Sequence, residues 1–239
     1  MKRIILTTAN NRYFDILRAF LASMRYHGNN TEIAADLINF TDNQVGSLCK
    51  IYENLTVSRI DIPYTTKVPE TDLLRLMYTR PNQMWRALNG PYEQVMSMDC
   101  DILIRGSLEH IWDGVKPNSF KILVKKCDKN NSKTHFQGGV YILGVSDATI
   151  SFYKEIMDTI GSEFGFWDGQ RALCEIYEKN RDGIELIKMD RTYNDERKLN
   201  MNKKSIVWHI KHRNFDLKIV KKELNKYLQI ANTYENNVP

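Results

Sequence analysis

The sequence of 239 residues lacks the features that mark several classes of protein. No apolar run approaches the ~20 residues that a membrane-spanning helix needs. Residues 1–6 resemble the start of a signal peptide, but the chain turns polar at residues 7–11, where an apolar stretch of ~7–15 residues would be required. We therefore expect a soluble protein that stays in the compartment where it is made, and we predict a cytoplasmic location.

Cysteine is also scarce, and internal repeats and low-complexity segments are absent. The four cysteines lie far apart and include no C-x-x-C pair, which favours free thiols in a reducing compartment over disulfides: Cys49, Cys100, Cys127 and Cys174. Apolar residues at 42% and charged residues at 26% exclude wholesale disorder. A chain of this length buries roughly 70–75% of its unfolded surface, so we predict one folded domain over residues 1–239.

The net charge of +5 is small and decides little. It suits an anionic partner such as a nucleoside diphosphate, but it is equally a solubility feature. In the basic helix expected near the C-terminus, Lys218, Lys222 and Lys226 recur every four residues and Lys221 lies beside them. Such a stripe is usually a solvated helix face. The alternatives are a peripheral contact with an anionic membrane, or an anion- or nucleic-acid-binding module.

Short β-rich runs alternate with amphipathic stretches along the chain. The pattern predicts strands at 3–8, 33–40, 55–62, 94–98, 120–125, 139–145 and 205–210. It predicts helices at 13–27, 43–54, 71–88, 147–160, 168–179 and 215–230, with a break or kink at Pro81. Strands separated by helices indicate crossover units, hence an α/β fold with a Rossmann-like mixed, mainly parallel sheet flanked by helices. Ligands bind beyond the carboxyl ends of such strands.

Asp99 and Asp101 are the first residues that indicate chemistry. Two carboxylates at i and i+2 can share a divalent cation that also contacts phosphate oxygens. The bare pattern has little weight, because 16 aspartates in 239 residues predict about one such pair by chance. Its context is more informative, since a strand at 95–98 delivers both acids to its carboxyl edge and an apolar run follows.

That context resembles a known family. Met98–Trp112 (MDCDILIRGSLEHIW) is similar to the metal-binding segment of GT-A-fold glycosyltransferases, most of all to the family 8 type. Three more landmarks follow in the family's order. They resemble the strand that lines the donor sugar, the helix start beside the acceptor and a late strand with a metal-ligating histidine: Phe136–Leu143, Trp167–Leu173 and Ser205–Lys211. Together the landmarks span residues 3–212 and imply a GT-A-type fold.

The resemblance implies a metal site and a nucleotide site. Asp101 and His209 would bind a divalent ion directly, and Asp99 would contribute to the ion and to the donor ribose. Carboxylate and imidazole ligands suit Mn²⁺, whereas Mg²⁺ prefers oxygen throughout. The nucleotide base would be read by the end of the first strand, and an aromatic ring would stack on it: Thr7, Thr8, Ala9 and Tyr13. Tyr13 also suits a core position.

The donor sugar and diphosphate would contact residues from later landmarks. Arg80 precedes Pro81 and would reach the donor, although such an arginine is commonly on the surface. The segment Gln137, Gly138 and Gly139 would line the sugar, although paired glycines also suit a turn. The family's G-x-x-K-P-W element is replaced here by KHRNF at residues 211–215. The cation that holds the diphosphate is therefore Lys211, His212 or Arg213.

Asp168 and Gln170 are the candidate catalytic residues. Asp168 stands at a helix start, where it can cap the helix, contact the acceptor hydroxyl or donor sugar, or do both. An inverting transferase needs a general base to deprotonate the acceptor. A retaining one forms a covalent intermediate or attacks from the leaving-group face. The residues leave the stereochemistry open.

We therefore expect a metal-dependent glycosyltransferase that moves a sugar from a nucleotide-diphosphate donor, expected to be a UDP-sugar, to a hydroxyl of a glycan, lipid or protein. Residues 1–112 would form the nucleotide- and metal-binding half, and residues 113–239 the sugar- and acceptor-binding half with the C-terminal helix. No nucleic-acid partner is expected. One alternative is a non-catalytic binder of nucleotide sugars or glycans. Another is a sugar nucleotidyltransferase, which the absence of glycine from residues 7–13 disfavours.

Overall fold

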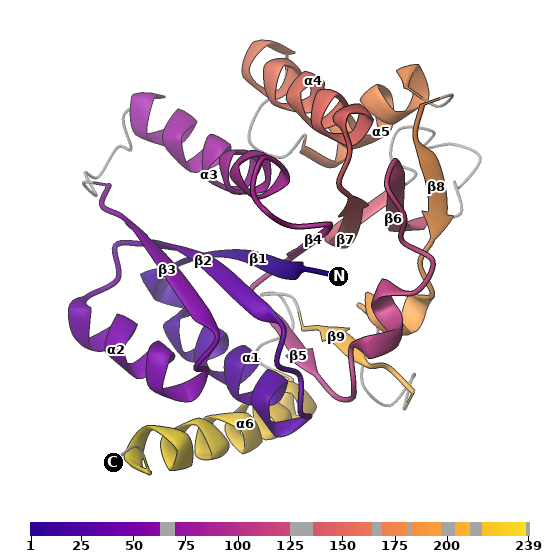
Figure 1. Cartoon of the computed structure of the whole chain (residues 1–239). Coiled ribbons are helices and arrows are strands. Elements are labelled where there is room, and N and C mark those ends of the chain that lie inside the picture. Colours follow the sequence, from indigo (N-terminus) through magenta and orange to yellow (C-terminus); the bar gives the residue numbers. More distant parts are fainter. Residues whose placement is uncertain are drawn as a thin grey trace. The chain divides into compact units, whose positions relative to one another are not determined.

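A computed structural model describes residues 1–62, 70–124, 136–163, 169–180, 183–196, 204–210 and 217–237 (Figure 1). Its strands are β1 (Arg3–Asn10), β2 (Glu32–Ile38), β3 (Leu55–Ile60), β4 (Gln94–Met98), β5 (Ile102–Ile104), β6 (Ser119–Val124), β7 (Phe136–Gly144), β8 (Glu185–Lys188) and β9 (Val207–His209). Its α-helices are α1 (Phe14–Tyr26), α2 (Asp42–Ile51), α3 (Glu70–Leu88), α4 (Asp147–Glu163), α5 (Gly169–Lys179) and α6 (Lys218–Asn236). Short 3₁₀ turns are η1 (Asn11–Tyr13), η2 (Glu109–Trp112) and η3 (Arg191–Tyr193).

The strands form a seven-stranded sheet in the order β3-β2-β1-β4-β7-β6-β8. Strand pairs β1·β4, β2·β3 and β6·β8 are parallel, and β6·β7 is antiparallel. The predicted α/β class with a mixed, mainly parallel sheet is therefore confirmed. Strands β5 and β9 form a separate two-stranded antiparallel sheet.

Three elements differ from the sequence-based expectations. The predicted helix around Pro81 is one helix, α3, without the expected break, because the φ of proline is compatible with a helix and its missing N–H removes a single backbone bond. A kink at Pro81 stays a prediction. Strand β8 was not predicted. The late strand predicted at 205–210 is shorter, and it pairs with β5, another strand that was not predicted.

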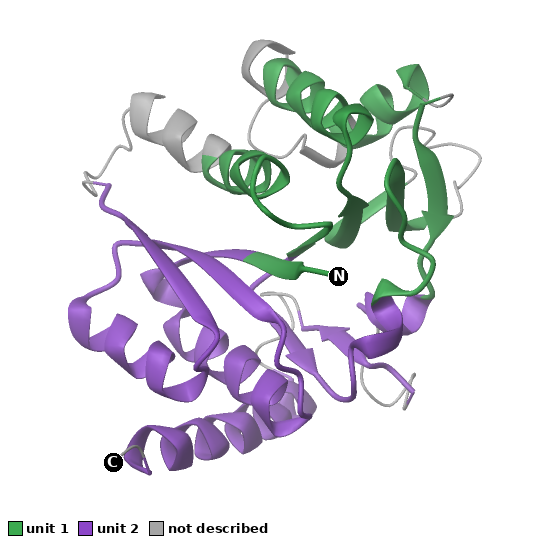
Figure 2. Ribbon diagram, viewed as in Figure 1, with its two compact units in different colours: residues 1–6, 63–97, 112–190 green, residues 7–62, 98–111, 191–239 purple. Residues whose placement is uncertain are grey.

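The described residues divide into two compact units (Figure 2). Unit 1 consists of residues 1–6, 63–97 and 112–190, and unit 2 of residues 7–62, 98–111 and 191–239. Each unit is therefore assembled from three separate segments. The expected halves, residues 1–112 and 113–239, stay a prediction about function.

In unit 2, helices α1, α2 and α6 pack together on one face of β2 and β3 (Figure 1). An apolar core joins α1, α6 and the small β5–β9 sheet: Ile16, Ala19, Leu103, Trp208, Ile210, Val220 and Tyr227. Polar bonds add to it, because Arg18 of α1 donates two hydrogen bonds to the Glu235 carboxylate of α6, each 2.8 Å long. The Ser47 hydroxyl of α2 donates to the same carboxylate. These contacts fix α6 against α1, α2 and the β5–β9 sheet.

Unit 1 has its own core, in which α4 and α5 pack with α3 and β7. Aromatic rings from β6, β7, α4 and α5 meet edge-on or tilted around Phe120, namely those of Phe136, Tyr141, Phe152 and Tyr177. This packing holds β7, the strand of the predicted sugar-lining segment. Within the described part of the chain, no helix has the length and apolar character needed to cross a membrane.

Candidate functional site

The two acids of the D-x-D motif lie between a buried strand and a second short strand. All five residues of β4 are buried, and all three residues of β5 are buried as well. The turn between these strands contains Asp99 and Asp101, whose side chains are 26% and 16% exposed. Apolar residues on both sides thus anchor a turn that keeps its carboxylates within reach of solvent.

His209 reaches the acids through the pairing of β5 with β9. The register sets Ile102 opposite His209, and the backbone N–H of Ile210 donates to the carbonyl of Asp101 (3.0 Å). Leu103 and Trp208, also paired, enter the apolar core under this small sheet. Packing in the core therefore sets the register, and the register brings together residues 108 positions apart in sequence.

The imidazole of His209 lies between the two carboxylates. Its Nε2 is 2.9 Å from Oδ1 of Asp101 and 3.3 Å from Oδ2 of Asp99. One ligand atom from each of the three residues lies within 4.8 Å of the others. We call these three residues the ligand cluster.

Charge and burial act in opposite directions on His209. Burial, the largest effect, would lower its pKa below 6.5. The hydrogen bond with Asp101 and the negative charges of Asp99 and Asp101 outweigh burial, so the pKa is raised. Glu196 adds to this rise. The cluster therefore attracts positive charge, which a proton supplies in the absence of another cation.

The residues of the ligand cluster fit a divalent ion. Neighbouring ligands of an octahedral ion, each about 2.1 Å from it, are about 3 Å apart. The two distances from Nε2, 2.9 and 3.3 Å, match that spacing. Two carboxylates with one imidazole form a donor set that suits Mn²⁺. Nδ1 of His209 is buried and has no hydrogen-bond partner among the described residues. The hydrogen bonding of the ring in that part of the structure is therefore on its Nε2 side, toward the acids.

Tyr13 approaches the same acids from the end of η1. Burial is the main cause that raises the pKa of its phenol, and the neighbouring Cys100, Asp101 and Asp99 add to it. The chain reaches this position through the last residues of β1, where Thr7 and Ala9 are buried and Thr8 is partly exposed. The side chain of Asn10 then accepts a hydrogen bond from the N–H of Arg12 and starts the turn. Unit 2 thus brings the predicted base-stacking ring close to the D-x-D acids.

In unit 1, Arg80 is fixed by two hydrogen bonds. Its Nε donates to the hydroxyl of Ser97 (2.8 Å) and its Nη2 donates to the carbonyl of Gly138 (3.3 Å). The guanidinium also lies over the ring of Tyr141, 5.9 Å from its centroid. The predicted donor arginine therefore contacts the predicted sugar-lining strand, in which Gln137 and Gly139 are buried.

The remaining predicted site residues fall partly or wholly outside the part of the chain that the structure describes. Asp168, Lys211, His212 and Arg213 are outside the described residues. Gln170 is the second residue of α5, and its side chain is outside the described part of the structure. Their assigned roles stay predictions.

Two residues that interact with predicted site residues were absent from the sequence-based predictions. Ser97 bonds Arg80 just before the acids, and Glu196 acts on His209 by its charge. Asp195, beside Glu196, forms a β-bridge with Trp208 and accepts a hydrogen bond from the N–H of His209 (2.9 Å). An acidic pair shortly before the histidine strand was the available signal for Glu196. Ser97 had no signal, because its role follows from the fold.

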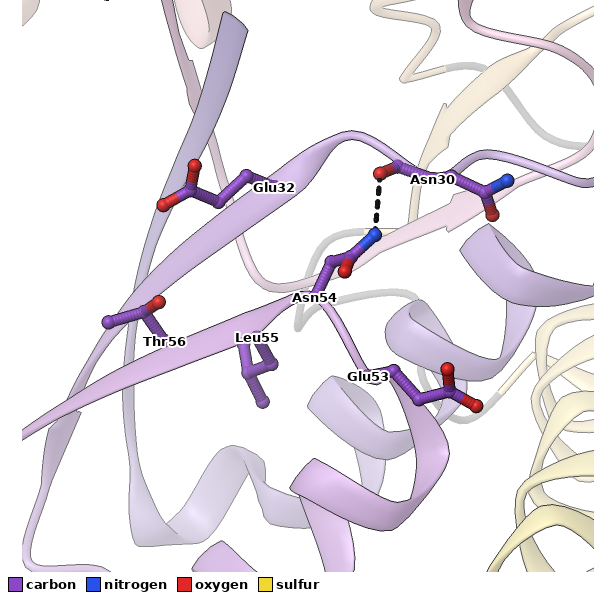
Figure 3. Close-up of a pocket in the computed structure, with 6 residues that line it drawn as sticks. All are labelled: Asn30, Glu32, Glu53, Asn54, Leu55 and Thr56. Carbon is purple, nitrogen blue, oxygen red and sulfur yellow. Dashed lines mark hydrogen bonds between the residues drawn. The ribbon is translucent and has the colours of Figure 1, made fainter. Parts of the chain in front are cut away.

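A surface pocket in unit 2 is lined by Asn30, Glu32, Glu53, Asn54, Leu55 and Thr56 (Figure 3). The side-chain amide of Asn54 donates to the carbonyl of Asn30 across it (2.9 Å). The carboxylates of Glu32 and Glu53 point away from each other (Figure 3). The pocket contains none of the predicted site residues, and its acids do not converge on a shared cation.

No known protein-family profile matches the sequence. No curated protein matches it either. Solved structures do match. The glycosyltransferase GlyE of Streptococcus pneumoniae TIGR4 aligns with a TM-score of 0.63 and 11% identity over 98% of this chain and 63% of its own. The galactosyltransferase LgtC, solved with donor and acceptor sugar analogues, aligns with a TM-score of 0.59 and 12% identity over 99% of this chain and 97% of its own.

The bifunctional glycosyltransferase WbbM aligns with a TM-score of 0.64 and 12% identity over all of this chain, but over only 50% of its own. The chain thus spans less than two thirds of GlyE and WbbM and almost the full length of LgtC. At these identities the likeness shows the fold. The chain has the fold of GT-A glycosyltransferases, as the D-x-D context predicts.

Proposed function

We propose that this protein is a metal-dependent glycosyltransferase that transfers a hexose from a nucleoside-diphosphate donor, a UDP-sugar, to a hydroxyl group. One observation carries the proposal: two carboxylates and an imidazole from distant segments converge at the end of the buried β4 strand. The structural relatives are glycosyltransferases, which supports the same reaction class. The acceptor would be a glycan, a lipid or a protein.

In this proposal Asp101 and His209 hold Mn²⁺ or Mg²⁺ directly, and Asp99 shares in the ion and the donor ribose. The bound ion supplies positive charge against the charge that develops on the departing diphosphate. The protein's part is to keep Nε2 of His209 within 2.9–3.3 Å of an oxygen of each acid before the ion arrives, which lowers the reorganisation that binding requires. Burial of His209 strengthens each of these electrostatic contacts.

The nucleotide and the sugar would be held by different elements. Thr7, Thr8 and Ala9 would contact the base through backbone groups, and Tyr13 would stack on it. This role is supported by the effect of the D-x-D acids on the phenol of Tyr13. On the sugar side, the proposed lining consists of Gln137, Gly138 and Gly139. Because Arg80 donates to the Gly138 carbonyl, Arg80 would orient this strand as well as contact the donor.

The chemical step would involve Asp168 and Gln170, of which Gln170 is the second residue of α5. Asp168 would contact the acceptor hydroxyl or the donor sugar, and Lys211 would hold the diphosphate two residues beyond His209. These roles rest on the sequence resemblance alone. Alanine substitution of each residue, followed by a comparison of donor hydrolysis with transfer, tests them.

We propose further that the protein acts in the cytoplasm and makes a peripheral contact with an anionic membrane through α6. The exposed lysines of this helix support the contact: Lys218, Lys221, Lys222 and Lys226. The first turn of α6 has no acid, so the positive end of the helix dipole adds to the charge of the lysines.

The deciding experiment is a thermal-shift screen of UDP, GDP, CDP and ADP, each with and without Mn²⁺. A ligand that binds only the folded state raises its apparent stability by mass action. We expect a shift with UDP that requires Mn²⁺, and slow metal-dependent hydrolysis of UDP-glucose or UDP-galactose without an acceptor. A folded protein that responds to no nucleotide contradicts the proposal, and nucleotide binding with no hydrolysis or transfer favours a non-catalytic binder.

A further inference from the structure

Three basic side chains of unit 2 converge away from the ligand cluster. His27 follows the end of α1, Arg105 follows β5, and Lys226 lies in the middle of α6. We call them the basic cluster. They are distant in sequence, and the proposed transfer reaction uses none of them.

The tyrosine at the centre of the basic cluster is fixed by hydrogen bonds. The hydroxyl of Tyr227 donates to the carbonyl of Ile104 (3.1 Å) and lies 3.0 Å from Nε2 of His27. Because its proton is used on Ile104, the hydroxyl accepts from the N–H of His27. Tyr227 is 1% exposed. The arrangement holds His27 beside the residue that precedes Arg105.

The backbone that carries Arg105 is also fixed. The N–H of Arg105 donates to the carbonyl of Ile206 (2.8 Å). The Asn29 side chain donates to the carbonyl of Gly106 (3.2 Å) and accepts from the N–H of Leu108 (2.7 Å). Asn29 is buried and follows the end of α1. The arginine is therefore presented from a rigid loop that is attached to the segment carrying His27.

The guanidinium of Arg105 has an unmet requirement for an acceptor. Its Nη1 is buried and has no hydrogen-bond partner among the described residues, although the residue as a whole is half-buried. A buried N–H of a charged group without an acceptor is costly, so such a group is normally paired. An anion bound at the exposed part of the guanidinium would supply an acceptor to this side chain.

The charges around His27 agree with such a site. Burial is the main cause that lowers the pKa of His27, and Lys226 and Arg105 lower it further. Both cations thus act on the same imidazole. Among the described residues, the charge of Glu223 opposes these cations: after burial, it helps to raise the pKa of Tyr227 to about 12. Positive charge predominates among these residues.

Aromatic rings flank the cations. Nζ of Lys226 lies 5.2 Å from the ring centroid of Tyr26 and 4.8 Å from that of Tyr227. Tyr26 is 52% exposed, which is unusual for a large ring, and it packs edge-on against His27. Tyrosine is enriched at interfaces because its ring is apolar and its hydroxyl is polar, so Tyr26 beside Lys226 suits a partner with a ring or an apolar part.

We propose that Arg105 and Lys226 bind a phosphate oxyanion beside His27, with Arg105 as the principal hydrogen-bond donor and Tyr26 beside the group that carries the phosphate. The phosphate belongs to an anionic lipid headgroup or to a soluble phosphate compound, which share this chemistry. The site is independent of the glycosyl-transfer step, so it stands or falls separately from that reaction. Lys226 also belongs to the proposed membrane contact of α6, and the vesicle experiment below separates the two by their dependence on Arg105.

The first test is a titration of the full-length protein with inorganic phosphate at constant ionic strength, followed by NMR of the His27 ring or by calorimetry. We expect saturable binding, and Arg105→Ala to weaken it at least about tenfold. Arg105→Lys keeps the charge but loses the planar donor fork, so it restores binding only in part. The matched control Arg191→Ala removes an exposed arginine and should leave the affinity within about twofold.

Two further variants guard against a folding artefact. Lys226→Ala removes an exposed side chain and should weaken phosphate binding about threefold with an unchanged melting temperature. Glu223→Gln removes the opposing charge and should tighten binding. Absence of phosphate binding by the wild type, or equal losses in Arg105→Ala and Arg191→Ala, would overturn the proposal.

Vesicles distinguish the two sources of the phosphate. We compare binding to vesicles of 30% phosphatidylglycerol in phosphatidylcholine with binding to pure phosphatidylcholine at low salt. Loss of vesicle binding in Arg105→Ala, but not in Lys188→Ala, assigns the site to a lipid headgroup. Phosphate binding that depends on Arg105, together with vesicle binding that does not, assigns it to a soluble compound.

Discussion

The two ends of strand β5 carry opposite charge. Before the strand come Asp99 and Asp101, which form the ligand cluster with His209. After it comes Arg105, in the basic cluster with His27 and Lys226. The strand itself has three residues, all buried. One short apolar element thus supports a cation-attracting group at one end and an anion-attracting group at the other.

The two clusters differ in how their partners arrive. The ligand cluster forms by strand pairing, because the β5–β9 register sets His209 next to the acids. The basic cluster forms by helix packing, because α1 and α6 bring His27 and Lys226 to the loop after β5. Both depend on the apolar core that contains Leu103, Trp208 and Tyr227. The ligand cluster and the basic cluster can therefore be changed one at a time, whereas both lose their positions if the shared core is disrupted.

Removal of the shared support should have the largest effect. Trp208 is 2% exposed and pairs with Leu103 in the core. We expect Trp208→Ala to lower the free energy of unfolding by about 3–5 kcal/mol, measured by urea denaturation, and to weaken Mn²⁺ and phosphate binding together. The partly buried Trp85 of unit 1 provides a control with a smaller expected loss. Selective loss of one ligand only would show that the core is not shared.

A change at the acidic end should affect that end alone. We expect Asp101→Asn to weaken Mn²⁺ binding at least about a hundredfold, since it replaces a charged ligand by a neutral amide. Phosphate binding should be unchanged. Asp158→Asn, at an exposed position of α4, controls for the loss of one negative charge. Calorimetry with each ligand measures both effects, and retention of Mn²⁺ affinity in Asp101→Asn argues against the ligand cluster.

Tyr227→Phe should affect the basic end. The variant loses the hydrogen bonds to Ile104 and His27 but keeps the ring in the core. We expect a loss of about 1–3 kcal/mol in the free energy of unfolding and weaker phosphate binding, with unchanged Mn²⁺ affinity. An equal decrease in Mn²⁺ affinity would mean that the two ends of β5 are coupled through α6.

The smallest effect should come from the far end of α6, where Glu235 pairs with Arg18 (2.8 Å). Burial would raise the pKa of Glu235, but the hydrogen bonds from Arg18 and Ser47 and the charges of Arg18 and Lys50 together lower it. The unfolded chain therefore takes up a proton first as the pH falls. The pair stabilises the fold above the ordinary pKa of 4.5, and this stability is lost as the pH falls through the lowered folded value.

We expect Glu235→Gln to lower the free energy of unfolding at pH 7 by about 1 kcal/mol and to flatten its decrease below pH 4.5. Both clusters should keep their ligands at pH 7. Urea denaturation between pH 3 and pH 7 measures the effect. An unchanged pH profile would show that the carboxylate is not held in its charged form.

Much of the fold could be predicted from the sequence. The strands that became β1, β4 and β7 and the helix that became α1 have strong apolar patterns, and each lies within a few residues of its predicted bounds. Strand β8 was missed because its four residues are mostly half-buried or exposed and lack a clear alternation. Strand β5 was missed because three apolar residues after the acids do not distinguish a strand from a buried loop.

The candidate site likewise has residues that the sequence predicted and contacts that it did not. The order of motifs predicted a site at Asp99, Asp101 and His209 before any distance was known, and the structure brings these three side chains together. The link between Arg80, Ser97 and Gly138 could not be foreseen, since their distances depend on how α3 packs against the sheet. The same holds for Glu196, whose effect on His209 follows from the β-bridge of its neighbour Asp195.

The sequence by itself therefore determined the α/β class, the mainly parallel sheet and the position of the two acids after a buried strand, because these follow from periodicity and from adjacent residues. The tertiary structure alone decided that β9 pairs with β5 in a separate sheet, and that His27 and Lys226 contact Tyr227 with Arg105 near enough to act on it by its charge. Contacts between distant segments depend on side-chain packing over the whole core, and no local pattern of residues encodes them.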